Sequence, residues 1–233
     1  MKVRKQLITA ALLAAGFGVG AANATPISLT KLTGITGGAV AATAVFRADL
    51  SSAAIGTLQS ITILDNSSGL GGAAGQFSGF DLDAIILSTT SCDSAVCVAG
   101  LSPLSAFNYS GGVIFTPGAQ RDPADAKLFG TGPTGSTVDD AVATLGLFDG
   151  ESIAGPGADG FVSLGDGGKI SFNLTSALST SGLYLYLGEV GDNGEALAGE
   201  ITISPNQVPE PVSLSLLAIG LAGLGIGRRR RRS

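Results

Sequence analysis

The second half of the chain contains the sequence Phe161-Val162-Ser163-Leu164-Gly165-Asp166-Gly167-Gly168-Lys169-Ile170-Ser171-Phe172-Asn173-Leu174. A short apolar run and a strictly alternating run flank four residues that are all Gly or Asp. A period of two is typical of a strand with one buried face, and Gly and Asp favour tight turns. The sequence therefore predicts two strands joined by a short turn as a β-hairpin.

Other parts of the chain combine β-branched residues, alternation and turn residues in the same way. Further strands are predicted over residues 58–64, 80–87, 112–115, 183–187 and 201–203. Residues 39–50 fit either a strand or a short helix, and residues 138–147 fit a helix. Seven or eight short strands predict an all-β fold, an antiparallel β-sandwich of jelly-roll type that spans residues 25–205.

Composition excludes several classes of enzyme and partner. The 233 residues include no His and two Cys, so Ser-His-Asp and Cys-His triads and His-ligated zinc are ruled out. Residues 25–211 hold five of the 13 Lys and Arg residues and all 18 Asp and Glu residues, which gives them a net charge of −13. Because so acidic a body repels nucleic acid, we do not expect nucleic acid as a partner.

The first 24 residues have the three parts of a secretory signal peptide. Basic residues open the segment, residues 7–22 are free of charge, and Ala22-Asn23-Ala24 matches the small-x-small cleavage pattern. We expect a signal helix that is removed by cleavage between Ala24 and Thr25. The alternative is an uncleaved anchor helix, but the apolar stretch is short for a membrane span.

The carboxyl end has an apolar segment between a Pro-Glu-Pro triplet and an arginine cluster. Residues 212–227 carry no charge and predict a transmembrane helix about 24 Å long, short of a hydrocarbon core of about 30 Å. The arginines favour the cytoplasmic side of a membrane, which leaves the body outside. They are Arg228, Arg229, Arg230, Arg231 and Arg232. Taken alone, the segment also fits an ordinary tail anchor.

Residues 206–233 as a whole resemble the PEP-CTERM sorting signal of exported bacterial proteins, which has these three parts in this order. The resemblance implies that Pro209, Glu210 and Pro211 are recognised by a membrane-embedded exosortase, a cysteine transpeptidase-like enzyme that cleaves the chain near them. It also implies an inner-membrane-anchored precursor and, after processing, a protein at the cell surface or in the extracellular exopolysaccharide and biofilm matrix. It implies nothing about the activity of residues 25–205.

Cys92 and Cys97 lie in the exported part of the chain, with four residues between them. Because disulfides form in oxidising compartments, we expect these two cysteines to form a local disulfide. The closed loop is small, so the expected stabilisation is only about 2 kcal/mol. The cysteine count and the compartment argue against a metal site or a thiol nucleophile.

Acidic turns are the only feature of the body that points to a ligand. Their carboxylates are the hard oxygen ligands that Ca²⁺ prefers, although none of the turns matches a complete EF-hand loop. The candidate ligands are Asp159, Asp166, Asp192 and Glu195. The alternative is that these residues serve only the turns themselves, which select Asp and Gly. We expect no other cofactor.

Two further patterns have a structural and a functional interpretation. Asp81 and Asp83 lie two residues apart on one strand face, and we expect a solvated edge there rather than a catalytic pair of carboxylates. Tyr184 and Tyr186 also share one face of a predicted strand. We expect them to pack on the sheet rather than to stack on a sugar.

The combined features favour an exported, non-enzymatic β-sandwich protein with a structural role at the cell surface or in the extracellular matrix. A secreted carbohydrate-binding module, with or without Ca²⁺, is the first alternative, since jelly-roll sandwiches commonly have that role. The second alternative is a hydrolase that uses two carboxylates. The acidic residues would supply its catalytic groups, but the sequence gives no geometry for them.

Overall fold

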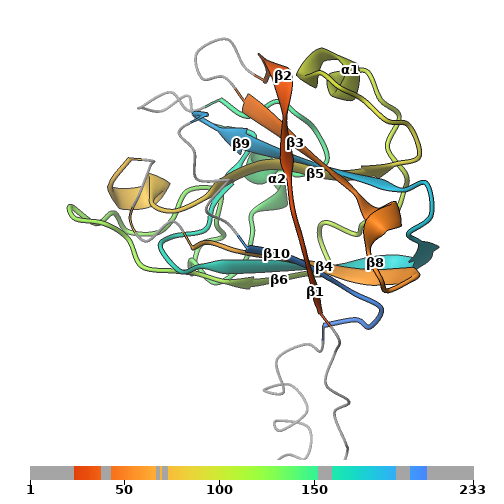
Figure 1. Ribbon diagram of the computed structural model, residues 1–233. Coiled ribbons are helices and arrows are strands. Elements are labelled where there is room, and N and C mark those ends of the chain that lie inside the picture. The colour runs from red at the N-terminus through yellow and green to blue at the C-terminus, as the bar shows by residue number, and fades with distance from the viewer. Residues whose placement is uncertain are drawn as a thin grey trace, which may run out of the picture.

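The computed structural model describes residues 24–37, 43–66, 69, 73–151, 159–192 and 200–208. Two five-stranded antiparallel sheets form two layers (Figure 1). Sheet A has the order β1 (Thr25–Ile27), β10 (Glu200–Ser204), β4 (Thr57–Leu64), β8 (Lys169–Ser179) and β6 (Val113–Thr116). Sheet B has the order β2 (Thr30–Thr36), β3 (Thr43–Asp49), β9 (Tyr184–Val190), β5 (Asp81–Ser88) and β7 (Val162–Ser163).

The helices of the described residues are short. They are α1 (Ala95–Ala99), α2 (Asp140–Ala143) and the 3-10 turns Leu50–Ser52 and Gly75–Phe77. In Figure 1, α1 lies beside β2 at the margin of sheet B. No helix of the described residues is long and apolar enough to cross a membrane.

Strands from the two halves of the chain pair in a nested order. β1 pairs with β10, β3 with β9, β4 with β8 and β5 with β7, so the chain doubles back like one long hairpin folded into two sheets. β2 and β6 extend the sheets as edge strands beside β3 and β8. The outermost pair places Thr25 opposite Ile203, so the two ends of the described body meet.

Alternation along the central strands builds the core between the two sheets. The inward side chains of both sheets are buried in one hydrophobic cluster. They include Ile61, Ile63, Ile170 and Phe172 from sheet A, and Leu82, Ile85, Leu185 and Leu187 from sheet B. Burial of a side chain of this size contributes roughly 1.5–3 kcal/mol, so this cluster holds the two layers together.

The predicted all-β fold of two antiparallel sheets is confirmed. β4, β5, β6, β9 and β10 each lie where the sequence predicts a strand. Residues 39–50 fitted either a strand or a helix, and their described part contains β3. Residues 138–147 fitted a helix, and they are helical only at α2. The prediction did not include β1 and β2, because β1 has three residues and β2 is largely exposed, without a regular apolar face.

The hairpin predicted over residues 161–174 is wrong. β7 pairs with β5 in sheet B, whereas β8 pairs with β4 and β6 in sheet A, so the glycine-rich turn crosses between the sheets. The turn bonds to a different part of the chain instead. Asp166 and Ala119 exchange both backbone hydrogen bonds, at 2.8 and 3.0 Å, and the Gly118 N–H donates to the Leu164 carbonyl at 2.8 Å.

The crossing needs glycine because backbones approach each other closely there. A Cβ on Gly168 would lie 1.8 Å from the Leu164 carbonyl oxygen, and one on Gly118 would lie 2.5 Å from the Asp166 carbonyl oxygen. Gly168 therefore serves close packing of backbone in addition to the turn itself, in which its N–H donates to the Gly165 carbonyl at 2.9 Å.

We expect Gly168→Ala to destabilise the fold by roughly 4 kcal/mol or more, because backbone would have to move. Gly167→Ala is the matched control: φ is +74° there, but nothing lies within 4 Å of the new Cβ. The left-handed conformation alone costs an alanine about 1–2 kcal/mol. Urea unfolding of both variants measures the difference, and equal losses would contradict the packed crossing.

Candidate functional site

The chain crosses the outer face of sheet A after its last strand. We call residues Pro205–Val208 the C-terminal strap. The side chains of Gln59 and Ser60 on β4 donate to the carbonyls of Pro205 and Asn206, at 2.7 and 2.6 Å. Ser60 is only 2% exposed, although it faces away from the hydrophobic core. The strap therefore covers part of this polar face.

The strap ends at β8, where Asn173 holds both backbone groups of Val208. The Val208 N–H donates to Asn173 Oδ1 at 2.8 Å, and Asn173 Nδ2 donates to the Val208 carbonyl at 3.0 Å. The Gln207 side chain adds a bond to the Leu174 carbonyl at 3.3 Å. An asparagine side chain can bond a backbone in this two-point way because its amide carries one acceptor and two donors.

The two predicted processing positions flank the folded body closely. Ala24 is exposed and directly precedes β1, while the strap ends one residue before Pro209. Figure 1 shows both coloured ends of the chain leaving the molecule on the side of β1 and β10. Residues 1–23 lie outside the described residues, as do the predicted recognition residues and the arginine cluster.

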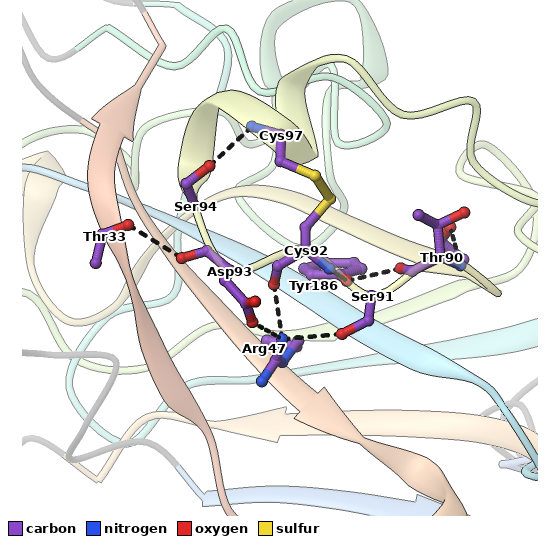
Figure 2. The surroundings of a disulfide bond; sticks show 10 residues. Thr33, Arg47, Thr90, Ser91, Cys92, Asp93, Ser94, Cys97 and Tyr186 are labelled. Carbon is purple, nitrogen blue, oxygen red and sulfur yellow. Dashed lines mark hydrogen bonds and ion pairs between the residues drawn. A yellow bond between two sulfur atoms is a disulfide. The ribbon is translucent and has the colours of Figure 1, made fainter.

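The predicted disulfide is present: Cys92 and Cys97 are bonded, with their Cα atoms 5.6 Å apart. The bridge closes the loop that leads into α1, where the Ser94 side chain accepts a hydrogen bond from the Cys97 N–H at 3.3 Å (Figure 2). Cys92 packs in a second hydrophobic cluster with Val98 and Tyr186. The disulfide loop therefore covers a patch on the outer face of sheet B.

Arg47 and Tyr186 fasten this loop to sheet B (Figure 2). Arg47 Nη1 donates to the Cys92 carbonyl at 2.8 Å and to Asp93 at 2.6 Å. The Tyr186 hydroxyl donates to the Thr90 carbonyl and accepts from the Cys92 N–H, both at 2.8 Å. The tyrosine is buried under the loop.

The expectation that both tyrosines pack on the sheet is confirmed. Tyr184 lies against the same cluster as Tyr186, and the Arg47 guanidinium lies 5.9 Å from the centre of its ring. The Tyr186 ring is fully buried and therefore forms no open platform for a sugar.

The solvated edge predicted for Asp81 and Asp83 is wrong, because both residues are buried. Asp81 accepts a hydrogen bond from the Ser163 hydroxyl. Asp83 Oδ1 accepts from the backbone N–H groups of Asp149 and Gly150, at 3.2 and 3.0 Å. The two carboxylates attach neighbouring segments to β5, and a substrate cannot reach them.

Burial also changes the acidity of Asp83. Its desolvation raises the pKa to about 7, against the lowering effect of the two backbone donors. The charge of Asp149 acts in the same direction as desolvation. Asp83 is thus a buried carboxyl that titrates near neutral pH.

The acidic positions predicted to bind Ca²⁺ have different neighbours. Asp166 forms an ion pair with Arg121 at 3.3 Å, Asp192 forms one with a lysine on β2, and Asp159 bonds through its backbone across its own loop. Glu195 lies outside the described residues. In the described part of the chain, no three His, Cys, Asp or Glu side chains form a group that could hold a metal ion. Calcium binding stays a prediction.

A groove of about 260 Å³ lies beside β6 and β8. Its lining includes Tyr109, Asp140, Thr137 and Asn173, which come from separate segments of the chain. The Tyr109 hydroxyl donates to the Ile85 carbonyl at 2.8 Å and so fixes the ring. Desolvation, with the charge of neighbouring Asp139, raises the pKa of Asp140. No local sequence pattern marks this groove, because its residues meet only in the folded chain.

Comparison with known proteins identifies the carboxyl end. Residues 207–232 match the family model of the PEP-CTERM protein-sorting motif, which therefore begins inside the C-terminal strap. The chain matches no curated protein and no solved structure.

A two-sheet body with this motif behind its last strand defines an exported passenger of a sorting system. The chain carries a PEP-CTERM protein-sorting motif at residues 207–232. This motif implies a membrane-anchored precursor that an exosortase, a membrane enzyme, processes and that is sorted to the cell surface.

We expect Asp83→Asn to change how stability depends on pH. The pKa of about 7 in the folded state exceeds the value of about 3.9 in the unfolded chain, so protonation favours folding. This contribution is fully present below about pH 4 and is lost as the pH rises through about 7. It amounts to no more than about 4 kcal/mol.

Thermal melting of both proteins between pH 4 and pH 8.5 tests this expectation. The wild type should lose stability relative to Asp83→Asn as the pH rises. Melting temperatures that stay parallel over the whole range would show that Asp83 does not titrate there.

Proposed function

We propose that the body is a non-enzymatic passenger with a structural role at the cell surface or in the exopolysaccharide matrix. The match to the sorting motif at residues 207–232 carries the location in this proposal. Two further observations support it. The chain has no His. Asp81 and Asp83, the pair of carboxylates that the sequence suggested for hydrolysis, are buried, and they accept hydrogen bonds from the Ser163 hydroxyl and from two backbone N–H groups, respectively.

We also propose that the sandwich is a jelly roll. Four nested antiparallel pairs, β1·β10, β3·β9, β4·β8 and β5·β7, support this topology. The two sheets then correspond to the two four-stranded layers of a jelly roll, with β2 and β6 as additions at the edges.

The sorting step is tested by replacing Pro209-Glu210-Pro211 with three alanines. We expect the uncut precursor to stay in the membrane fraction of the native host, because the exosortase loses its recognition residues. Mass spectrometry of both termini is the readout. The processed wild type should begin at Thr25 and end near residues 209–211, without the arginines. Pro133→Ala, at an exposed loop proline, is the control.

An intact arginine cluster in the mature wild type would contradict sorting and leave a plain tail-anchored protein. Unchanged processing of the alanine variant would show that the triplet is not the recognition element.

A second candidate function is carbohydrate binding, supported by the groove beside β6. It places a fixed tyrosine next to a carboxylate, an amide and a hydroxyl, at Tyr109, Asp140, Asn173 and Thr137. Hydrogen-bonding groups around an aromatic ring suit a polyhydroxylated ligand, and the groove could take one sugar unit of a polysaccharide.

Calorimetry with the host's exopolysaccharide tests this candidate. We expect Asp140→Ala to weaken binding about 10-fold or more, as loss of a hydrogen bond to a charged group does. Glu200→Gln, at an exposed acid on β10, is the control. A repeat with a chelator shows whether Ca²⁺ takes part. Absence of heat with the wild type would exclude this function for that polysaccharide.

A further inference from the structure

The C-terminal strap leaves no free linker between the folded body and the sorting motif. Its last residue, Val208, is held at both backbone groups, and Pro209 is the next residue of the chain. The family match begins at Gln207, whose side chain bonds to β8. Two residues of the motif are therefore attached to the body.

The side chains of sheet A that bind the strap, which we call its seat, are placed by the register of β4 and β8. Ser60 and Asn173 are direct partners across this strand pair, and they bond to Asn206 and Val208 in the strap. The bonds from Gln59 and Gln207, the second bond of Asn173 and a bond from the Asn206 N–H to the Ser204 hydroxyl on β10 bring the number of hydrogen bonds that hold the strap to six. Each of them uses a polar side chain of sheet A or of the strap and none uses a core side chain, so the strap can detach without opening the core.

An enzyme that cleaves a peptide bond binds the chain in an extended form, through its backbone groups. On the amino-terminal side of the Pro-Glu-Pro triplet, those groups belong to the strap. The carbonyl and N–H of Val208 cannot bond to Asn173 and to an enzyme cleft at the same time. Binding of the chain by the enzyme at the triplet therefore competes with binding of the strap to its seat on sheet A.

We propose that the bound C-terminal strap slows exosortase processing, an effect that we call the brake. Asn173 is the positioning residue that holds the strap in its bound state. The proposal rests on the proposed sorting of the chain by an exosortase. The bound strap holds the motif against the body, and the enzyme acts on the fraction of molecules in which the strap is released. Asn173→Ala removes both bonds to Val208 and should raise that fraction about 10-fold.

The first experiment follows conversion of precursor to mature protein by pulse–chase in the native host. We compare the wild type, Asn173→Ala and Ser60→Ala with Ser171→Ala as the matched control. Ser171 lies on the outer face of the same strand and bonds to Thr62, at 2.8 Å, rather than to the strap. A further form carries a six-residue Gly-Ser insertion between Val208 and Pro209, which supplies a free linker and leaves the seat intact.

The second experiment measures hydrogen exchange in the uncut precursor, stabilised by alanines at residues 209–211. The peptide that covers the strap reports the amides of residues 206–208. The Val208 amide, which donates to Asn173, should exchange about 10-fold faster in Asn173→Ala, while the melting temperature and the exchange of β4 and β8 stay unchanged. A merely structural role of Asn173 would instead lower the melting temperature and also speed the exchange of β4 and β8.

The brake predicts faster processing of Asn173→Ala and of the insertion form, with Ser171→Ala at the wild-type rate. It also predicts that Asn173→Ala gives no further increase within the insertion form. Equal rates for the wild type, Asn173→Ala and the insertion form would overturn the brake and leave sorting intact. Slower processing of Asn173→Ala would likewise overturn it, since the strap would then guide the enzyme. If no form is shortened, the sorting function itself fails, and the brake fails with it.

Discussion

The antiparallel pairing of β4 with β8 at the centre of sheet A is the contact on which the other parts depend. Its register turns Ile61 and Phe172 into the core, and it turns Ser60 and Asn173 to the outer face as a direct pair. Because side chains alternate along a strand, a shift of one residue would exchange the two faces. The same register that packs the sandwich therefore also builds the seat for the C-terminal strap. β10 and β6 flank this pair on its two sides, so sheet A is assembled around it.

Buried carboxylates form a second set of attachments, between the strands and the long connections. Asp65 accepts from the N–H groups of Phe80 and Gly167, which lie on different segments, and Asp83 holds the loop at residues 149–150. A carboxylate with two backbone donors replaces the water that those groups would otherwise bind. Part of the charge of the acidic body therefore serves the fold rather than a ligand, and an Asp in a turn sequence does not by itself indicate a cation site.

Patterns that are local in sequence predicted the fold well, and long-range contacts limited the rest. β4 and β9 were predicted from their alternating sequences, because a period of two in hydrophobicity is a direct signature of a β-strand. The hairpin over residues 161–174 failed because its turn pairs with residues 118–119, which no local signal reveals. The sorting motif was predictable because it is linear. Its attachment to Asn173 was not, because that residue lies 35 positions from Val208 and only the folded sheet brings them together.

The strap is held less firmly than β10, the strand that precedes it, and it can therefore be released locally. β10 is held by ladders to β1 and β4 and by the buried side chains of Ile201 and Ile203. The strap has no buried apolar side chain and relies on hydrogen bonds that contribute roughly 0.5–1.5 kcal/mol each. Opening the strap therefore costs far less than opening β10, and it can detach while the sandwich stays folded. The same hydrogen-bonding groups of sheet A stay in place when the strap detaches, so the strap can bind them again while the core remains closed.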